Sequence, residues 1–96
     1  MRFGLLENQF GNIDGEVINN DLFIHFNYYK EMFTKTNYTE MLDVWSIVLS
    51  SLKETGVKHI HTCVSKEDTK TNRFQAMFGL EVFKENEQAT IYRMEL

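Results

Sequence analysis

The chain has 96 residues, 43% of them hydrophobic, 14% aromatic and 25% charged, and its formal net charge is −4. This length allows one domain with one modest core, and the aromatic content excludes an intrinsically disordered chain. The net negative charge argues against a general nucleic-acid binder, because phosphate contacts need clustered lysines and arginines.

A single cysteine and the lack of long apolar runs indicate the compartment. Cys63 alone excludes an intrachain disulfide and is typical of a reducing environment. No apolar run approaches the roughly 20 residues of a membrane-spanning helix, and the first residues lack the apolar stretch of a signal peptide. We therefore expect a cytoplasmic protein with no membrane partner.

The N-terminal third of the chain is predicted to form β-strands. Apolar and polar side chains alternate over residues 22–29, which predicts a strand with one buried face. The apolar members of this alternation are Leu22, Ile24, Phe26 and Tyr28. Shorter strands are expected at residues 3–7 and 16–18, separated by turns at residues 11–12 and 14–15.

A long amphipathic helix is predicted over residues 38–55. Its apolar side chains recur in steps of three and four, so they share one face that packs against a sheet. These residues are Tyr38, Met41, Leu42, Trp45, Val48, Leu49 and Leu52. Asn37 followed by Glu40 is a capping-box pattern, and Gly56 stands where helices often end in a left-handed residue.

The C-terminal third is predicted to form a strand, a short helix and a hairpin. The strand covers residues 57–64, and the helix covers residues 69–78 with Asp68 and Gly79 as its caps. Its expected buried side chains are Phe74, Met77 and Phe78. Residues 80–85 and 88–95 then alternate around a turn.

The predicted order of elements is β-β-β-α-β-α-β-β. A long helix between two strands implies a right-handed parallel crossover. We therefore predict an α/β sheet that is antiparallel at its start and holds one parallel pair in the middle.

This order, together with the segment from Asp68 to Val82, resembles the GCN5-related N-acetyltransferase (GNAT) family. Arg73-Phe74 and Gly79-Leu80 fall at the spacing of the family's pattern. The resemblance covers residues 22–96 and implies a GNAT-like mixed sheet in a single domain, residues 1–96, that lacks the family's N-terminal strand and helices. Short, diverged proteins of this type are frequent in tailed phages, so it also implies a viral protein of the virion or host cytoplasm.

The resemblance implies acetyl-CoA as the cofactor, but the expected pyrophosphate loop, residues 36–41, departs from the family's pattern. The family uses glycines there so that phosphate oxygens can approach backbone N–H groups. Thr39 and Met41 stand in their place, and Glu40 would repel the phosphates while Lys35 compensates in part. The cofactor is therefore either none or acetyl-CoA. Its expected contacts are Tyr29, Lys35, Tyr38, Thr39, Glu40 and Met41.

The candidate catalytic residues are two histidines. His25 or His61 would deprotonate an amine, because the ordinary pKa of histidine lies close to neutral; ordinary surface histidines are the alternative. Gln75 stands where many family members have a tyrosine acid, and an amide is no general acid. Cys63 is expected to be a buried thiol. His59, His61 and Cys63 share a strand face at a spacing too wide for one metal ion, so no metal site is predicted.

Two functions from different classes remain open. In the first, the scaffold is a protein-binding module whose transferase activity is weak or lost, with Tyr29, Phe33 and Tyr38 as an aromatic contact patch. In the second, the chain is an acetyl-CoA-dependent N-acetyltransferase that acts on an amine of a protein or small molecule. A free first strand would also allow pairing with a second copy of the chain.

Overall fold

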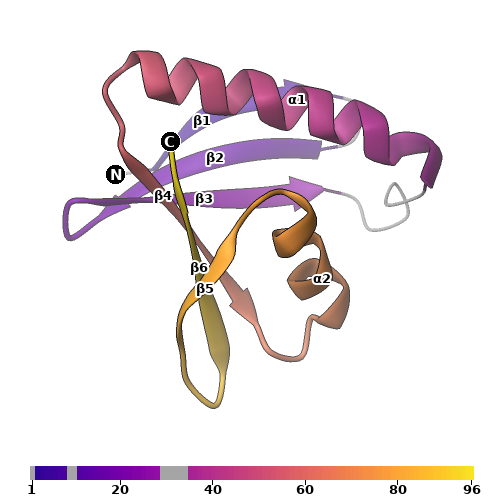
Figure 1. Ribbon diagram of the computed structural model, residues 1–96, viewed down its shortest axis with the longest axis vertical. Helices are drawn as coiled ribbons and strands as arrows, with labels where there is room; N and C mark the ends of the chain where they lie inside the picture. Colours follow the sequence, from indigo (N-terminus) through magenta and orange to yellow (C-terminus); the bar gives the residue numbers. More distant parts are fainter. Residues whose placement is uncertain (1, 9–10, 29–34) are drawn as a thin grey trace.

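The computed structural model describes residues 2–8, 11–28 and 35–96, which form a mixed α/β domain with a six-stranded sheet and two helices (Figure 1). The elements are β1 (Arg2–Asn8), β2 (Gly11–Ile18), β3 (Asp21–Tyr28), α1 (Lys35–Glu54), β4 (His59–Ser65), α2 (Thr69–Met77), β5 (Glu81–Glu85) and β6 (Ala89–Glu95). The predicted order of elements is confirmed. Within these residues, neither helix has the length and hydropathy needed to cross a membrane.

The sheet is antiparallel except at its centre. Its strands lie in the order β1-β2-β3-β4-β6-β5. β3 and β4 are parallel, with α1 between them in the chain, whereas every other neighbouring pair is antiparallel. The predicted single parallel pair in the middle of the sheet is therefore confirmed.

The turns between the first three strands differ from the prediction. β2 and β3 are joined by Asn19-Asn20, whose φ angles are 51° and 69°. Two residues with positive φ are typical of the type I′ hairpin turn, and asparagine tolerates this conformation better than most residues. The turns predicted at residues 11–12 and 14–15 are wrong, because all four residues lie within β2.

Gly15 serves close packing inside β2. It lies opposite Phe3 of β1. A Cβ atom at this position would stand 2.8 Å from Phe3 Cζ and 3.3 Å from Leu22 Cδ1. Glycine inside a strand often marks such a close approach. The missing side chain therefore allows the Phe3 ring to lie against the sheet.

Helix α1 ends where the sequence predicts but begins earlier. Gly56 has a φ of 90°, and the N–H of Val57 donates to the Leu52 carbonyl with an N to O distance of 3.3 Å. These are the features of a Schellman motif. The helix begins at Lys35, so the capping box predicted at Asn37 is wrong.

Helix α2 is capped at both ends as predicted. The Asp68 carboxylate accepts two hydrogen bonds from Thr71, one from the backbone N–H at 3.2 Å and one from the side-chain hydroxyl at 2.7 Å. At the other end Gly79 has a φ of 87°, and the N–H of Leu80 donates to the Gln75 carbonyl at 3.0 Å. These bonds satisfy backbone groups that a helix end would otherwise leave unpaired.

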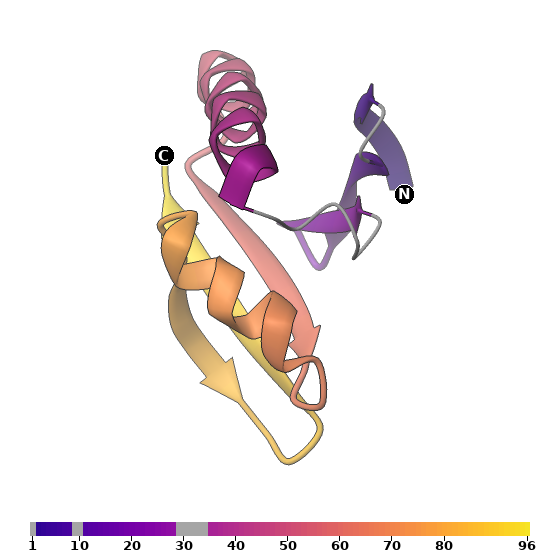
Figure 2. The same cartoon turned by 90° about the vertical axis from the view of Figure 1, so that its right-hand side faces the viewer.

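Both helices pack on the same face of the sheet and enclose the hydrophobic core (Figure 2). Trp45 of α1 joins the two helices, because its Nε1–H donates to the Phe78 carbonyl over 2.9 Å. The Phe26 ring of β3 packs against both side chains, with centroid distances of 5.1 Å and 5.8 Å. Trp45 and Phe78 are buried, as predicted. The prediction for Met77 is wrong: it is 49% exposed, and the polar Gln75 is buried in the same helix instead.

Candidate functional site

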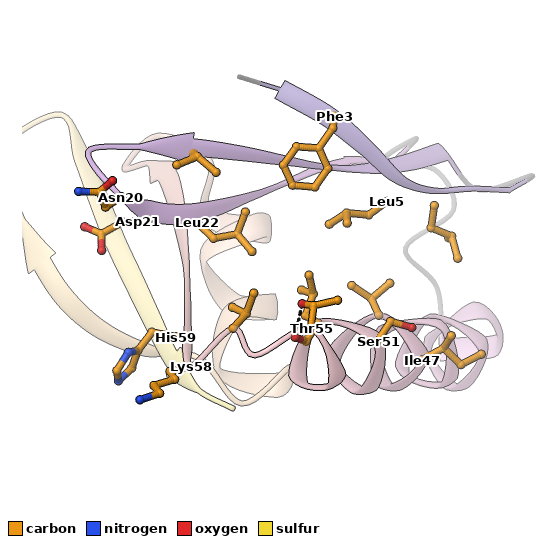
Figure 3. Close-up of a pocket in the computed structure, with 15 residues that line it drawn as sticks. Phe3, Leu5, Asn20, Asp21, Leu22, Ile47, Ser51, Thr55, Lys58 and His59 are labelled. Carbon is orange, nitrogen blue, oxygen red and sulfur yellow. Dashed lines mark hydrogen bonds between the residues drawn. The ribbon is translucent and has the colours of Figure 1, made fainter.

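A hollow lined by described residues lies between α1 and the first three strands (Figure 3). We call this cavity of about 610 Å³ the groove. Its apolar lining residues are Phe3, Leu5, Leu6, Val17, Leu22, Ile47, Val48, Leu52 and Val57. Polar groups gather toward one end, where Asp21 and Lys58 contribute opposite charges.

Three large apolar side chains of the groove remain in contact with water. Phe3 is 37% exposed, Val17 45% and Ile47 61%. They come from β1, β2 and α1, so the chain segments that carry them are far apart in sequence. A cluster of exposed apolar side chains around a hollow often marks an interaction site. Neither the groove nor its residues was predicted as a site, because no local pattern joins the three segments.

A second hollow lies where β3 and β4 separate. Their parallel ladder consists of one residue pair, Phe23 and His61, and the strands diverge toward their C-terminal ends (Figure 1). We call the resulting cavity of about 180 Å³ the cleft. It is lined by Ile24, His25, Phe26, Asn27, Thr62, Cys63, Val64, Asp68, Thr71 and Gln75.

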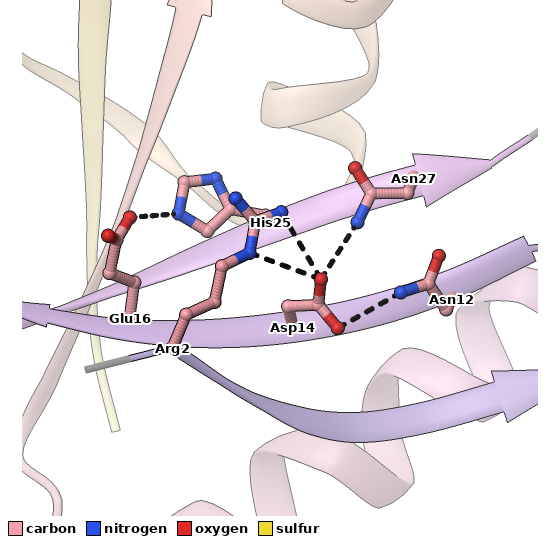
Figure 4. Close-up of polar contacts among 6 residues, drawn as sticks. All are labelled: Arg2, Asn12, Asp14, Glu16, His25 and Asn27. Atoms are coloured by element: carbon pink, nitrogen blue, oxygen red, sulfur yellow. Dashed lines mark hydrogen bonds and ion pairs between the residues drawn. The ribbon is translucent and has the colours of Figure 1, made fainter.

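His25 lies at the cleft with a carboxylate beside it. Its Nε2 atom is 2.9 Å from Glu16 Oε1, and the two side chains are 28% and 31% exposed (Figure 4). Because a carboxylate oxygen accepts, Nε2 carries the hydrogen in this pair, and Nδ1 then holds the lone pair of the neutral ring. A carboxylate in this position holds the imidazole ring in one orientation.

Asp14 holds the neighbouring part of this sheet face in place. Its Oδ2 atom accepts hydrogen bonds from Arg2 Nη2 at 3.2 Å and Asn27 Nδ2 at 3.1 Å (Figure 4). Its Oδ1 atom accepts one from Asn12 Nδ2 at 3.0 Å. These contacts join β1, β2 and β3, on the sheet face that carries His25.

His61, the other candidate base, is packed away from water. It is 5% exposed, and its ring stacks on Phe23 with a centroid distance of 5.2 Å and meets the Phe83 ring at 5.8 Å. Its Nδ1–H donates to the Leu22 carbonyl at 3.3 Å. His61 does not line the cleft. Of the two predicted histidines, His25 therefore has the better geometry for accepting a proton.

Gln75 has a structural role at the position of the family's tyrosine. It is 1% exposed; its Oε1 accepts the Thr62 hydroxyl at 2.6 Å, and its Nε2 donates to the Thr71 carbonyl at 3.1 Å. The side chain therefore ties α2 to β4. Cys63, predicted to be buried, is exposed, because its side chain alternates with the buried Thr62 and Val64 on the strand.

The segment predicted to form the cofactor loop is helical. Residues 36–41 lie within α1, so the N–H groups of Thr39, Glu40 and Met41 come after the first turn, beyond the unpaired groups of the helix end. Thr39 and Glu40 are exposed, whereas Met41 is 2% exposed and belongs to the core. The prediction of a loop at residues 36–41 is therefore wrong.

The predicted aromatic patch lies largely outside the described part of the chain. Tyr29 and Phe33 fall between residues 28 and 35, which the structure does not describe. Lys35 and Tyr38 belong to the first turn of α1, but their side chains are likewise outside the description. The patch therefore stays a prediction. Across residues 2–8, 11–28 and 35–96, the structure brings no three His, Cys, Asp or Glu side chains together as a metal site.

Comparisons with protein-family models, curated proteins and solved structures find no match to this chain.

Proposed function

We propose that this domain is a protein-binding module that holds an amphipathic helix of a partner protein in the groove. The observation that carries the proposal is the exposure of Phe3, Val17 and Ile47 around one apolar hollow. Full burial of such a side chain contributes about 1.5–3 kcal/mol, so covering these partly exposed ones contributes about 1 kcal/mol each.

The shape of the groove supports a helix as its occupant. One wall is α1, and β1 forms the other side of the hollow (Figure 3). Helices that pack side by side have their axes about 8–10 Å apart and present apolar residues on one face. A partner helix that lies beside α1 would cover the sheet over β1 and β2. Helix-in-groove recognition of this kind uses apolar anchors three, four and seven residues apart.

The test is a selection of helical peptides against the intact chain, followed by affinity measurements on variants. Ile47→Glu places a charge in the groove at a side chain that is 61% exposed, so the fold is retained. Met77→Glu is the matched control, because Met77 is 49% exposed but does not line the groove. We expect selected peptides with an apolar stripe, whose affinity falls at least about ten-fold for Ile47→Glu and stays unchanged for Met77→Glu.

Two outcomes would contradict this function. The first is a selection that yields no peptide binder under conditions where the chain is folded. The second is a set of binders whose affinity for Ile47→Glu equals that for Met77→Glu, because binding would then occur elsewhere on the surface.

The cleft supports acyl transfer as a second candidate function. The divergent parallel strands form the cleft toward which the thioester end of acetyl-CoA would point, and an amine would attack that thioester. The pyrophosphate end fits less well, because the predicted loop is helical and Glu40 exposes a carboxylate in the second turn of α1. His25 Nδ1 would take the proton that the amine loses as the coenzyme A thiolate leaves, while Glu16 orients the ring through Nε2.

This second function is tested with acetyl-CoA and a panel of primary amines. His25→Gln retains a partner for Glu16 but removes the base, and we expect its rate to fall about 100-fold or more. Cys63→Ser is the control, because Cys63 also lines the cleft without taking part in proton transfer. Two results together would exclude a transferase. Acetyl-CoA would not raise the melting temperature of the chain, and no free coenzyme A thiol would form when acetyl-CoA and amines are both present.

A further inference from the structure

The first strand lies at an edge of the sheet. In the strand order of the described residues, β1 has β2 as its one neighbour (Figures 1 and 2). The outer side of an edge strand presents backbone N–H and C=O groups that can pair with another strand. The side chains of the strand decide which other strand fits.

An irregularity in β1 places Arg2 and Glu7 on the same side of the sheet. The register shifts between Gly4 and Leu6. Arg2 lies opposite Glu16 and Glu7 lies opposite Asn12, and these two β2 residues point to the same side of the sheet. In a regular strand, residues 2 and 7 would point to opposite sides, because their separation is odd.

The apolar residues of β1 follow the same symmetry. Phe3 lies opposite Gly15 and Leu6 lies opposite Ile13, both on the face that α1 covers. Each half of the strand therefore has a charged residue at its outer end and an apolar residue next to it. The two central residues are Gly4 and Leu5. The two terminal charges, on Arg2 and Glu7, have opposite signs.

We propose that a second copy of this chain pairs with β1 in antiparallel orientation, about a two-fold axis between Gly4 and Leu5. Arg2 of each copy then lies opposite Glu7 of the other, and Phe3 lies opposite Leu6. Opposite charges and apolar pairs that face each other across an antiparallel ladder are favourable, whereas like charges are unfavourable. Self-complementarity of the strand favours a second copy over an unrelated strand.

This inference goes beyond the proposed function, because it concerns the backbone edge of β1 and the charges of Arg2 and Glu7 on the side of the sheet away from the groove. Phe3 and Leu6, which also line the groove, would pair on the other side of the same edge. Arg2 is able to serve both contacts. Its Nη2 and Nε atoms lie 3.2 Å and 3.3 Å from Asp14 Oδ2, and a guanidinium has further N–H donors. Its side chain is 48% exposed, so a second carboxylate can reach it.

The test is a charge exchange measured by sedimentation equilibrium from about 1 µM to about 1 mM protein at low salt. Arg2→Glu alone and Glu7→Arg alone place like charges opposite each other in a symmetric dimer. We expect each variant to dimerise roughly ten-fold more weakly than the unchanged chain. An equimolar mixture of the two variants restores both opposite-charge pairs in a heterodimer, and its affinity returns to that of the unchanged chain.

Two controls separate this result from others. Glu81→Arg makes the same charge change on β5, at the other end of the strand order, and should leave dimerisation unchanged. Melting temperatures check folding, since Arg2→Glu also removes the contact with Asp14. Ile47→Glu, the groove variant, should dimerise like the unchanged chain, so failure of the groove proposal is distinguishable from failure here.

A chain that stays monomeric over the whole concentration range overturns the proposal. So does a dimer that both single variants leave intact, or a mixture that dimerises no better than either variant alone.

Discussion

The buried contact between Thr62 and Gln75 gives the sharpest test of how α2 is held on the sheet. Thr62→Val replaces the hydroxyl with a methyl group of similar size and leaves Gln75 Oε1 without its donor. The two residues are 2% and 1% exposed, so water does not replace the bond. A buried polar group left unpaired costs about 1–3 kcal/mol. We therefore expect the free energy of unfolding to fall by about 2 kcal/mol.

The converse substitution and the double variant make the prediction specific. Gln75→Met retains the shape of the side chain but leaves the Thr62 hydroxyl without its acceptor at 2.6 Å, and it should cost a similar amount. In the double variant neither polar group remains in this contact. Its destabilisation should therefore be smaller than the sum of the two single effects by about 1 kcal/mol or more.

The assay is urea denaturation of all four proteins followed by circular dichroism, with thermal melts in parallel. For a domain of this size, 2 kcal/mol corresponds to a fall in melting temperature of about 8–16 °C. Strictly additive single effects would refute the reasoning, because they would show that the two side chains do not depend on each other. Equal m-values across the set are required for the comparison.

Three further predictions concern the helix ends and a buried tyrosine. Trp45→Phe removes the donor to the Phe78 carbonyl and part of the core volume, so urea denaturation should show a loss of about 2–3 kcal/mol. Gly56→Ala should cost about 1 kcal/mol in the same assay, because φ is 90° there while no atom lies within 4 Å of the added Cβ. Burial, and secondarily the charge of Glu85, raises the pKa of Tyr92 above its ordinary value of 10.0. The unfolded chain therefore loses this proton first, and stability should fall as the pH rises above 10.0 in a titration, a fall that Tyr92→Phe removes.

Local signals in the sequence were sufficient for the order of the elements and for most helix ends, but not for β2, of which only residues 16–18 were predicted as strand. The steps of three and four predicted α1, and Asp68, Gly56 and Gly79 marked helix ends because each acts through its own backbone neighbours. A long helix between two strands was enough to predict the parallel pair. The start of α1 was missed because hydrogen bonds extend the helix past its packed stripe.

The candidate sites depended on contacts between distant segments. His25 was named from its residue type and its place on a predicted strand, whereas its pairing with Glu16 followed from the register of β2 on β3. Gly15 looked like a turn residue, but its role depends on the Phe3 ring from another strand.

The sequence by itself determined the order of strands and helices in this chain, since periodicity and capping act within a few residues. Only the tertiary structure decided which apolar side chains stay exposed. Met77 of α2 was predicted to be buried but is 49% exposed, and the polar Gln75 of the same helix is 1% exposed, because burial depends on what the rest of the chain places opposite each side chain. The groove and the edge of β1 have the same origin. In both, the fold brings apolar side chains or backbone groups together and leaves them exposed.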